Sequence, residues 1–143
     1  MNDRFRFRAK RIDNNEFAYG FLCFIFRDVC RIYCSKEDKF YDCATKTLGQ
    51  CTGLKDKNDQ LIYEGDIILS NLDYGGTYFI IVGGVRGYCY DAVAVEEYEQ
   101  YLKSNKSDLC FRLSATAYHI ITDHGPCKVI GNIHENPKLL EDK

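Results

Sequence analysis

The chain has 143 residues, of which 45% are apolar or aromatic and 28% are charged, and its formal net charge is −2 at pH 7. Its length suits one compact domain or two small β-units that share a core. A net charge this small does not imply a partner held mainly by long-range electrostatics, and no apolar run reaches the roughly 18 residues of a membrane span. No secretory signal follows the charged start, so we expect a cytoplasmic protein.

The chain begins with a basic segment, DRFRFRAKRID, in which cations and apolar residues alternate. As a strand it would have two different faces, namely Arg4, Arg6, Arg8 and Lys10 on one side and Phe5, Phe7 and Ala9 on the other. One interpretation, which adds Arg11, is a groove for nucleic-acid backbones. The other is a solvated strand face whose like charges discourage edge pairing. We favour the second, because the aromatic residues of the segment face away from its cations.

The segment FLCFIFRDVCRIYC predicts a β-hairpin that turns at Arg27 and Asp28. One face would be apolar and rich in cysteine: Phe21, Cys23, Ile25, Cys30, Ile32 and Cys34. The opposite face would also be apolar: Leu22, Phe24, Phe26, Val29 and Tyr33. The first face can line the core, whereas the second needs a cover, which is either the rest of the chain or a second copy. We therefore expect a homo-oligomer, with a monomer as the alternative.

The eight cysteines include no Cys-x-x-Cys pair. In a strand, Cys30 and Cys34 would lie about 13 Å apart, too far to share one zinc ion. We expect reduced, metal-free thiols that serve as small core residues, and no cofactor. The sequence also lacks the motifs of phosphate-binding loops, zinc proteases and serine hydrolases, so we expect no enzyme.

The stretch LGQCTGLKDKNDQLIYEGDIILS, residues 48–70, predicts a turn, a strand, a sharp redirection of the chain and a second strand. Its Asx residues favour the turn, and Gly65 permits the redirection. Glu64 and Asp66 could act as an acid and a base. We favour the simpler alternative, a turn in which Asp66 accepts hydrogen bonds from backbone amides.

Further strands are predicted at Thr77–Val82, Val85–Tyr90, Leu109–Leu113, Tyr118–Ile121 and PCKVIGNI. In VEEYEQYLKSN, apolar residues recur at three- and four-residue steps, which predicts a helix whose tyrosines pack in the core. Asn136 and Pro137 predict the start of a short C-terminal helix.

Three segments together resemble the YopX family of phage and prophage proteins. They are GQCTGLKDKNDQLIYEGDII in the middle, VIGNIHENPKLLE near the end, and FRFRAKRID followed by Tyr19 and Gly20 near the start. The resemblance implies a mainly β protein with an SH3-like barrel in its later part and short helices only. It implies no established activity. We therefore expect an N-terminal β-unit over residues 1–47 and a barrel region over residues 48–143.

Two residues depart from the family pattern. Cys51 stands in place of an aromatic residue, and Asp59 stands in place of a glycine after asparagine in the turn. Because Asn-Gly suits a two-residue turn best, the second departure favours a looser loop.

Three functions remain open. The first, which we favour, is a non-catalytic phage or prophage accessory protein that self-associates and binds a host or phage component in the host bacterial cell. The second is a nucleic-acid-binding module, and the third is a counter-defence protein that sequesters a small nucleotide. The candidate binding residues are Arg4, Arg6, Arg8, Thr52, Asp56, Tyr63, Glu64, Asp66 and Asn132. We expect those in the family motifs to serve mainly folding.

Overall fold

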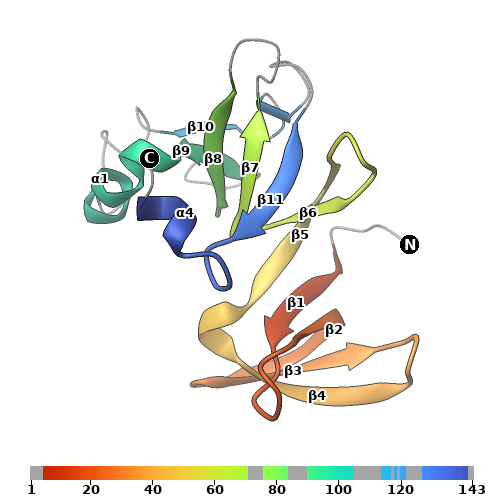
Figure 1. Cartoon of the computed structure of the whole chain (residues 1–143). Helices are drawn as coiled ribbons and strands as arrows, with labels where there is room; N and C mark the ends of the chain where they lie inside the picture. Colours follow the sequence, from red (N-terminus) through yellow and green to blue (C-terminus); the bar gives the residue numbers. More distant parts are fainter. Residues whose placement is uncertain are drawn as a thin grey trace. The chain divides into compact units, whose positions relative to one another are not determined.

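The computed structural model describes residues 5–70, 76–83, 90–104, 114–116, 118, 120–121 and 127–141. The chain divides into two compact units, Met1–Gly53 and Leu54–Lys143 (Figure 1). The boundary thus lies six residues beyond the one that the sequence suggested. Most described residues belong to strands of two antiparallel sheets, so the prediction of a mainly β protein is confirmed.

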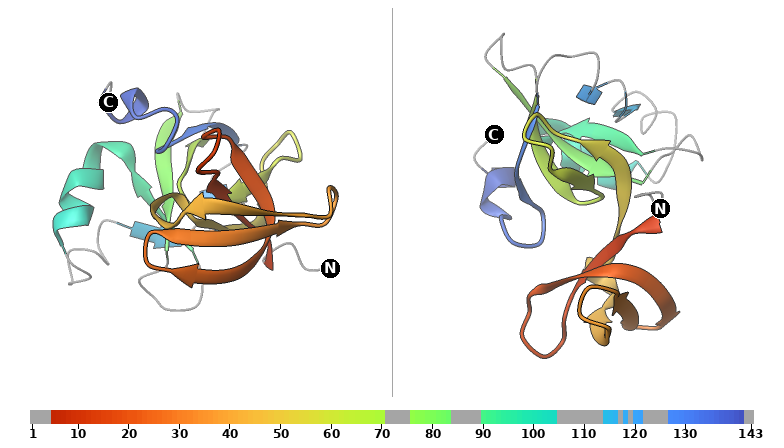
Figure 2. Two further views of the ribbon diagram at one scale, coloured as in Figure 1. Left: turned by 90° about the horizontal axis from the view of Figure 1, so that it is seen from below. Right: turned by 90° about the vertical axis from the view of Figure 1, so that its right-hand side faces the viewer.

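The first unit is built from neighbouring antiparallel strands in the order β4, β3, β2, β1 and β5. These strands are β1 (Phe7–Lys10), β2 (Phe17–Phe26), β3 (Val29–Cys34), β4 (Lys39–Ala44) and β5 (Gly49–Lys55). Figure 2 shows the unit, coloured red to orange, from two further sides. A short 3-10 helix, Thr45–Thr47, connects β4 to β5. The predicted hairpin turn at Arg27 is confirmed.

The sheet of the first unit bends until the end of β1 meets β4. Arg11, one residue beyond β1, forms an antiparallel bridge with Cys43. Next to it, the Ile12 amide donates a hydrogen bond of 3.0 Å to the Asp42 carbonyl oxygen. The core on the concave side consists of Ala9, Ala18, Cys30, Ile32 and Cys43, all buried. Four of these five side chains are small, which lets the strands approach closely.

A β-bulge in β2 places Leu22 on the core face of the hairpin and Phe21 on the opposite face, the reverse of the prediction. The register shifts between Leu22 and Phe24, so Cys23 is the extra residue. Leu22 pairs with Ile32 and packs against the core cluster, whereas Phe21 lies on the other face. The expectation that Phe21 and Cys23 line the core was wrong, because the alternation of faces changes phase at an inserted residue.

The second unit contains a five-stranded sheet with the order β10, β9, β8, β7 and β11. Its strands are β7 (Asp66–Ser70), β8 (Thr77–Val82), β9 (Asp91–Ala94), β10 (Ser114–Thr116) and β11 (Lys128–Asn132). A further strand, β6 (Leu61–Tyr63), instead neighbours β5 in the first sheet. No closed barrel is found in the described part of the chain, so the SH3-like barrel is not confirmed.

Both faces of this five-stranded sheet are covered by apolar residues. Ile68 and Ile81 belong to one buried cluster, and their neighbours Ile67 and Ile80 belong to another. Successive residues of a strand point to opposite faces, so runs such as Ile67–Leu69 must be apolar throughout. The second cluster also contacts Tyr98 of α1 (Tyr98–Lys103) and Leu139 of α4 (Lys138–Glu141).

The predicted elements of the second half have three outcomes. The strand Thr77–Val82, the helix in VEEYEQYLKSN and the short helix after Pro137 are confirmed. The prediction of a strand at Tyr118–Ile121 is wrong, because Tyr118, Ile120 and Ile121 are helical. The strands Val85–Tyr90 and Leu109–Leu113 lie, apart from Tyr90, outside the described residues. Within the described residues, no helix is long and apolar enough to cross a membrane.

The six cysteines that the structure describes are free thiols, and four of them are buried. Cys30, Cys43 and Cys51 are fully buried, Cys127 is 2% exposed, and Cys23 is exposed. Burial raises the pKa of the Cys43 thiol to about 11. Burial also raises the pKa of Cys30 and of Cys127. These thiols are therefore protonated at neutral pH and poor nucleophiles.

We predict that a water-soluble disulfide reagent separates these two classes of thiol. Cys89 and Cys110 lie outside the described residues and Cys34 is half-buried, so these three are first changed to serine. In this background, the Cys23 thiol of the native protein should react rapidly. Cys30, Cys43, Cys51 and Cys127 should react only after denaturant is added. The measurement is the absorbance of the released thiol over time. Modification of the four buried thiols as fast as Cys23 would contradict this packing, and stoichiometric zinc would contradict the metal-free state.

Candidate binding surface

The carboxylate of Asp56 binds three backbone amides and is 7% exposed. Its Oδ1 accepts hydrogen bonds from the amides of Asn58 and Gln60, both at 2.9 Å. Its Oδ2 accepts the amide of Val129 in β11, also at 2.9 Å. One side chain therefore both shapes the local loop and joins it to a strand 73 positions later. Hydrogen bonds to a charged acceptor are among the strongest in proteins.

The loop that Asp56 organises is longer than a two-residue turn. Asp56 and Gln60 are joined by a backbone hydrogen bond, and the Asp59 amide donates to the Asp56 carbonyl oxygen. Asp59 itself has a φ of +66°, in the left-handed region. This is a three-residue hairpin loop, whose last position favours glycine. Aspartate is among the few other residues that tolerate it, so the loop keeps its form despite the departure from the family pattern.

Gly65 and Asp66 hold the redirection between β6 and β7. Gly65 has a φ of +93°, and its amide donates to the Ile81 carbonyl oxygen at 2.8 Å while its own carbonyl oxygen accepts the Ile133 amide at 2.9 Å. Asp66 is 1% exposed, and its Oδ2 accepts the Tyr63 amide at 2.8 Å. Asp66 thus binds backbone, as we favoured over an acid and base pair.

The closing motif is explained by a tight turn after β11. The side chain of Asn132 accepts the amides of His134 and Glu135, and the Asn132 amide donates to the side-chain oxygen of Asn136 at 3.1 Å. A Cβ on Gly131 would lie 2.5 Å from that same Asn136 oxygen. A side chain at residue 131 would therefore displace the Asn136 side chain from this turn. The side chain of Asn136 thus stabilises this turn and not, as predicted, the start of α4.

The structure places the predicted binding residues in different environments. Thr52, Asp56, Tyr63, Asp66 and Asn132 are buried, Glu64 is half-buried, Arg6 is exposed, Arg8 is 5% exposed, and Arg4 lies outside the described residues. The buried ones have little surface for a partner to contact, which agrees with a role in folding. The expectation that Arg8 and Lys10 form a solvated strand face was wrong, because Lys10 is only 7% exposed.

The second apolar face predicted for the hairpin lies on the convex side of the first unit, and the structure extends it to residues of β4 that the sequence did not place there. Strand register puts Phe24 opposite Arg31, and Tyr33 between Phe21 and Phe40. Directly paired residues share a face, and these point away from the core cluster. Together with Phe26, Tyr19 and Asp42, we call them the outward face. Four of its rings are strongly exposed: Tyr19 47%, Phe24 44%, Phe26 67% and Phe40 61%.

Cations lie against the aromatic rings of this unit. The Arg31 guanidinium lies 5.2 Å from the centre of the Phe24 ring, and that of Arg27 lies 5.5 Å from Phe26. Arg8 and Lys10 lie over Phe17, at 4.6 and 4.9 Å. Alternation within β1 alone placed its cations and its aromatic residues on opposite faces. The ring that Arg8 and Lys10 contact, Phe17, comes from the neighbouring strand β2. Pairing of β1 with β2 is the signal that could have revealed this arrangement.

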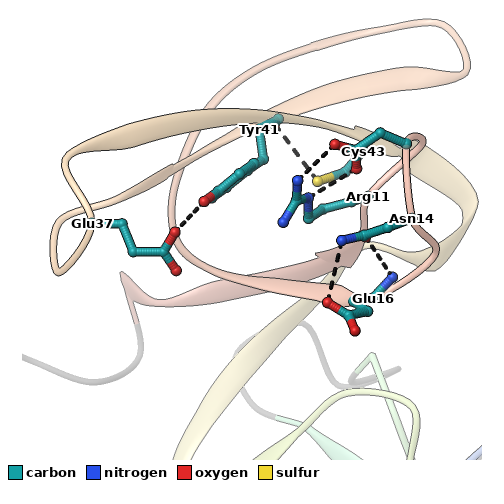
Figure 3. A network of polar contacts seen from close by, with 7 residues as sticks. Arg11, Asn14, Glu16, Glu37, Tyr41 and Cys43 are labelled. Atoms are coloured by element: carbon teal, nitrogen blue, oxygen red, sulfur yellow. Dashed lines mark hydrogen bonds and ion pairs between the residues drawn. The ribbon is translucent and has the colours of Figure 1, made fainter.

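A second polar cluster supports the loop between β1 and β2 (Figure 3). Arg11 binds both carboxylate oxygens of Asp13, at 2.9 and 2.6 Å, and lies 4.1 Å from the centre of the Tyr41 ring. The hydrogen bond from Arg11 lowers the pKa of Asp13, and the hydrogen bond to Glu37 raises the pKa of Tyr41. Arg11 and Tyr41 are half-buried but their partners Asp13 and Glu37 are exposed, so each pair contributes little to stability. We infer that these contacts serve mainly to fix the conformation of the loop.

No group of three or more His, Cys, Asp or Glu residues that could hold a metal ion occurs among the residues described. The outward face is therefore the candidate binding surface of this chain, and the family motifs form its folding framework.

We predict that the motif residues determine stability. Asp56→Ala should lower the free energy of unfolding by about 3 kcal/mol, because three amides lose their acceptor. Gly65→Ala should lower it by more than about 1 kcal/mol, because φ is positive there. Lys57→Ala, an exposed neighbour, should change it by less than about 0.5 kcal/mol. Denaturant titration followed by circular dichroism measures all three, and full stability of the first two variants would refute the folding role.

Comparison with known proteins shows where this chain belongs. No curated protein matches it. The crystal structure of protein EF1440 from Enterococcus faecalis is similar, with a TM-score of 0.50 and 23% sequence identity over 94% of this chain and 96% of that chain. At this identity the likeness shows the fold alone. A family model described as YopX protein matches residues 6–141, nearly the whole chain. The chain therefore belongs to the YopX protein family.

Proposed function

We propose that this chain is a non-catalytic accessory protein of phage or prophage origin that self-associates and binds a host or phage component. Membership of the YopX family supports the proposed origin. The observation that carries the proposal is the large exposed apolar surface of the first unit. Phe24, Phe26 and Phe40 are all more than two-fifths exposed. Contiguous exposed apolar residues are typical of interaction surfaces.

Self-association is assigned to the end of the β2–β3 hairpin. Ile25 and Phe26 are adjacent in β2 and therefore point to opposite faces. Even so, they are 53% and 67% exposed. We call these two residues the apolar tip. A second copy presents an identical tip, and a closed symmetric contact is the commonest way for identical chains to bury such residues.

Nucleic-acid binding is the second candidate function, and the guanidinium groups against exposed rings favour it. Arginine and aromatic side chains together form the surfaces on which nucleic-acid bases stack. Nothing in the described residues specifically favours the third candidate, sequestration of a small nucleotide.

We predict that Ile25→Ser weakens self-association. Light scattering coupled to size exclusion, over a concentration series, should give the wild type an average mass that rises above the chain mass of 16.5 kDa. The variant should stay closer to that mass, because serine removes apolar area from the contact. Ile12→Ser is the matched control, since Ile12 is 59% exposed but lies outside the tip. A wild-type mass of 16.5 kDa at every concentration would refute self-association.

A further inference from the structure

We propose that the outward face of the first unit binds single-stranded nucleic acid by stacking bases on its exposed rings. The inference rests on the proposed function in one respect, namely that this face is the chain's binding surface. It does not require self-association, and Phe26 is the residue that the apolar tip and this face share.

The first argument is the arrangement of the rings. Phe24 and Phe26 lie two residues apart on one strand, so their attachment points are about 6.6 Å apart along it. The ring of Tyr33, on the next strand, lies 4.9 Å from that of Phe40, centre to centre, in a tilted arrangement. Stacked bases in one strand repeat at about 3.4 Å. Phe24 and Phe26 are therefore spaced for bases that are separated from one another, as in an extended single strand. Tyr33 and Phe40 pack against each other and together offer one further stacking position.

The second argument is the position of the cations. Arg31 and Arg27 lie against Phe24 and Phe26, and guanidinium groups bind phosphate through paired N–H donors. The Nε of Arg31 donates to the Asp42 carboxylate at 2.9 Å, but both side chains are 41% or more exposed. Exposed ion pairs of this kind contribute little, so a phosphate group can replace the carboxylate.

The third argument is the uneven charge of the chain. Residues 1–53 contain ten Lys and Arg against seven Asp and Glu, a net charge of +3, whereas residues 54–143 contain nine against fourteen, a net charge of −5. The small total charge therefore conceals a basic unit that carries the exposed rings. The excess positive charge comes from residues 1–16 and Lys46, whereas residues 17–44 contain four Lys and Arg against four Asp and Glu. A polyanion is therefore attracted to the unit by its first strand and to the outward face by the individual arginines on it.

Single strands fit this face better than a duplex. In a duplex both sides of each base are already stacked, so exposed rings gain no contact with them. In a single strand every base has an accessible π-face, and each base stacked on an aromatic side chain contributes substantially to affinity. The same chemistry suits DNA and RNA, so both must be measured.

The test is fluorescence anisotropy with labelled oligo-dT and oligo-rU of about 15 nucleotides, a length that one small β-domain can cover. Phe40→Leu keeps an apolar side chain but removes the π-face, and it should weaken binding by about 5-fold to about 100-fold. Phe5→Leu is the matched control, because Phe5 is 62% exposed against 61% for Phe40 and lies outside β2, β3 and β4. It should change the affinity by less than about twofold.

A salt series tests the role of the cations. Between about 50 and about 200 mM salt, Arg27→Gln should reduce the slope of log affinity against log salt by about 0.7, the value for one phosphate contact on a single strand. Lys46→Gln removes the same charge at an exposed residue of the 3-10 helix after β4 and should leave the slope unchanged. A duplex of the same length should bind more weakly than either single strand.

Several results would overturn the inference: no binding by the wild type at low salt, equal affinity for the duplex, or unchanged affinity in Phe40→Leu. A lower mass of Phe40→Leu in light scattering, without weaker nucleic-acid binding, would show that a second copy covers the face instead. Oligonucleotide binding by a strictly monomeric chain would refute self-association and support the inference. Self-association without oligonucleotide binding would support the proposed self-association and refute the inference.

Discussion

The carboxylate of Asp56 is the interaction on which the second unit most depends. Its two oxygens have separate tasks, since Oδ1 shapes the hairpin loop and Oδ2 fixes that loop to β11. Beside it, the Lys57 amide donates to the Cys127 carbonyl oxygen at 2.9 Å. The opening and closing segments of the unit are therefore joined at one buried point. Burial of a carboxylate is tolerated only when its acceptors are satisfied in this way.

The remaining motif residues extend the same framework. Gly65 connects to both β8 and the segment after β11 through its own backbone, and Gly131 leaves room for the Asn136 side chain. These positions require an absent Cβ or a particular backbone angle rather than a chemical group. The motif residues thus stabilise the fold, and the proposed binding surface lies elsewhere, on strands β2 to β4.

The sequence predicted features that depend on local chemistry. The Asx loop, the redirection at Gly65, the hairpin turn at Arg27 and the short C-terminal helix all follow from residues close together in the chain. Features that depend on pairing between strands could not be predicted. The bulge at Cys23 changes which residues of β2 face the core, although no residue type in this segment predicts a bulge. Arg8 meets Phe17 only because β1 pairs with β2, and β6 joins a different sheet from β7.

Native-state amide exchange in the isosteric variant Asp56→Asn tests the central claim most directly. Asparagine has one acceptor oxygen and one amide donor, so it can keep the loop bonds or the bond to β11, but not both. We predict that the Val129 amide loses about tenfold to a hundredfold in protection relative to the Ile80 amide. The amides of Asn58 and Gln60 should keep theirs. Unchanged protection of all three amides, Val129, Asn58 and Gln60, would show that the carboxylate does not join the loop to β11.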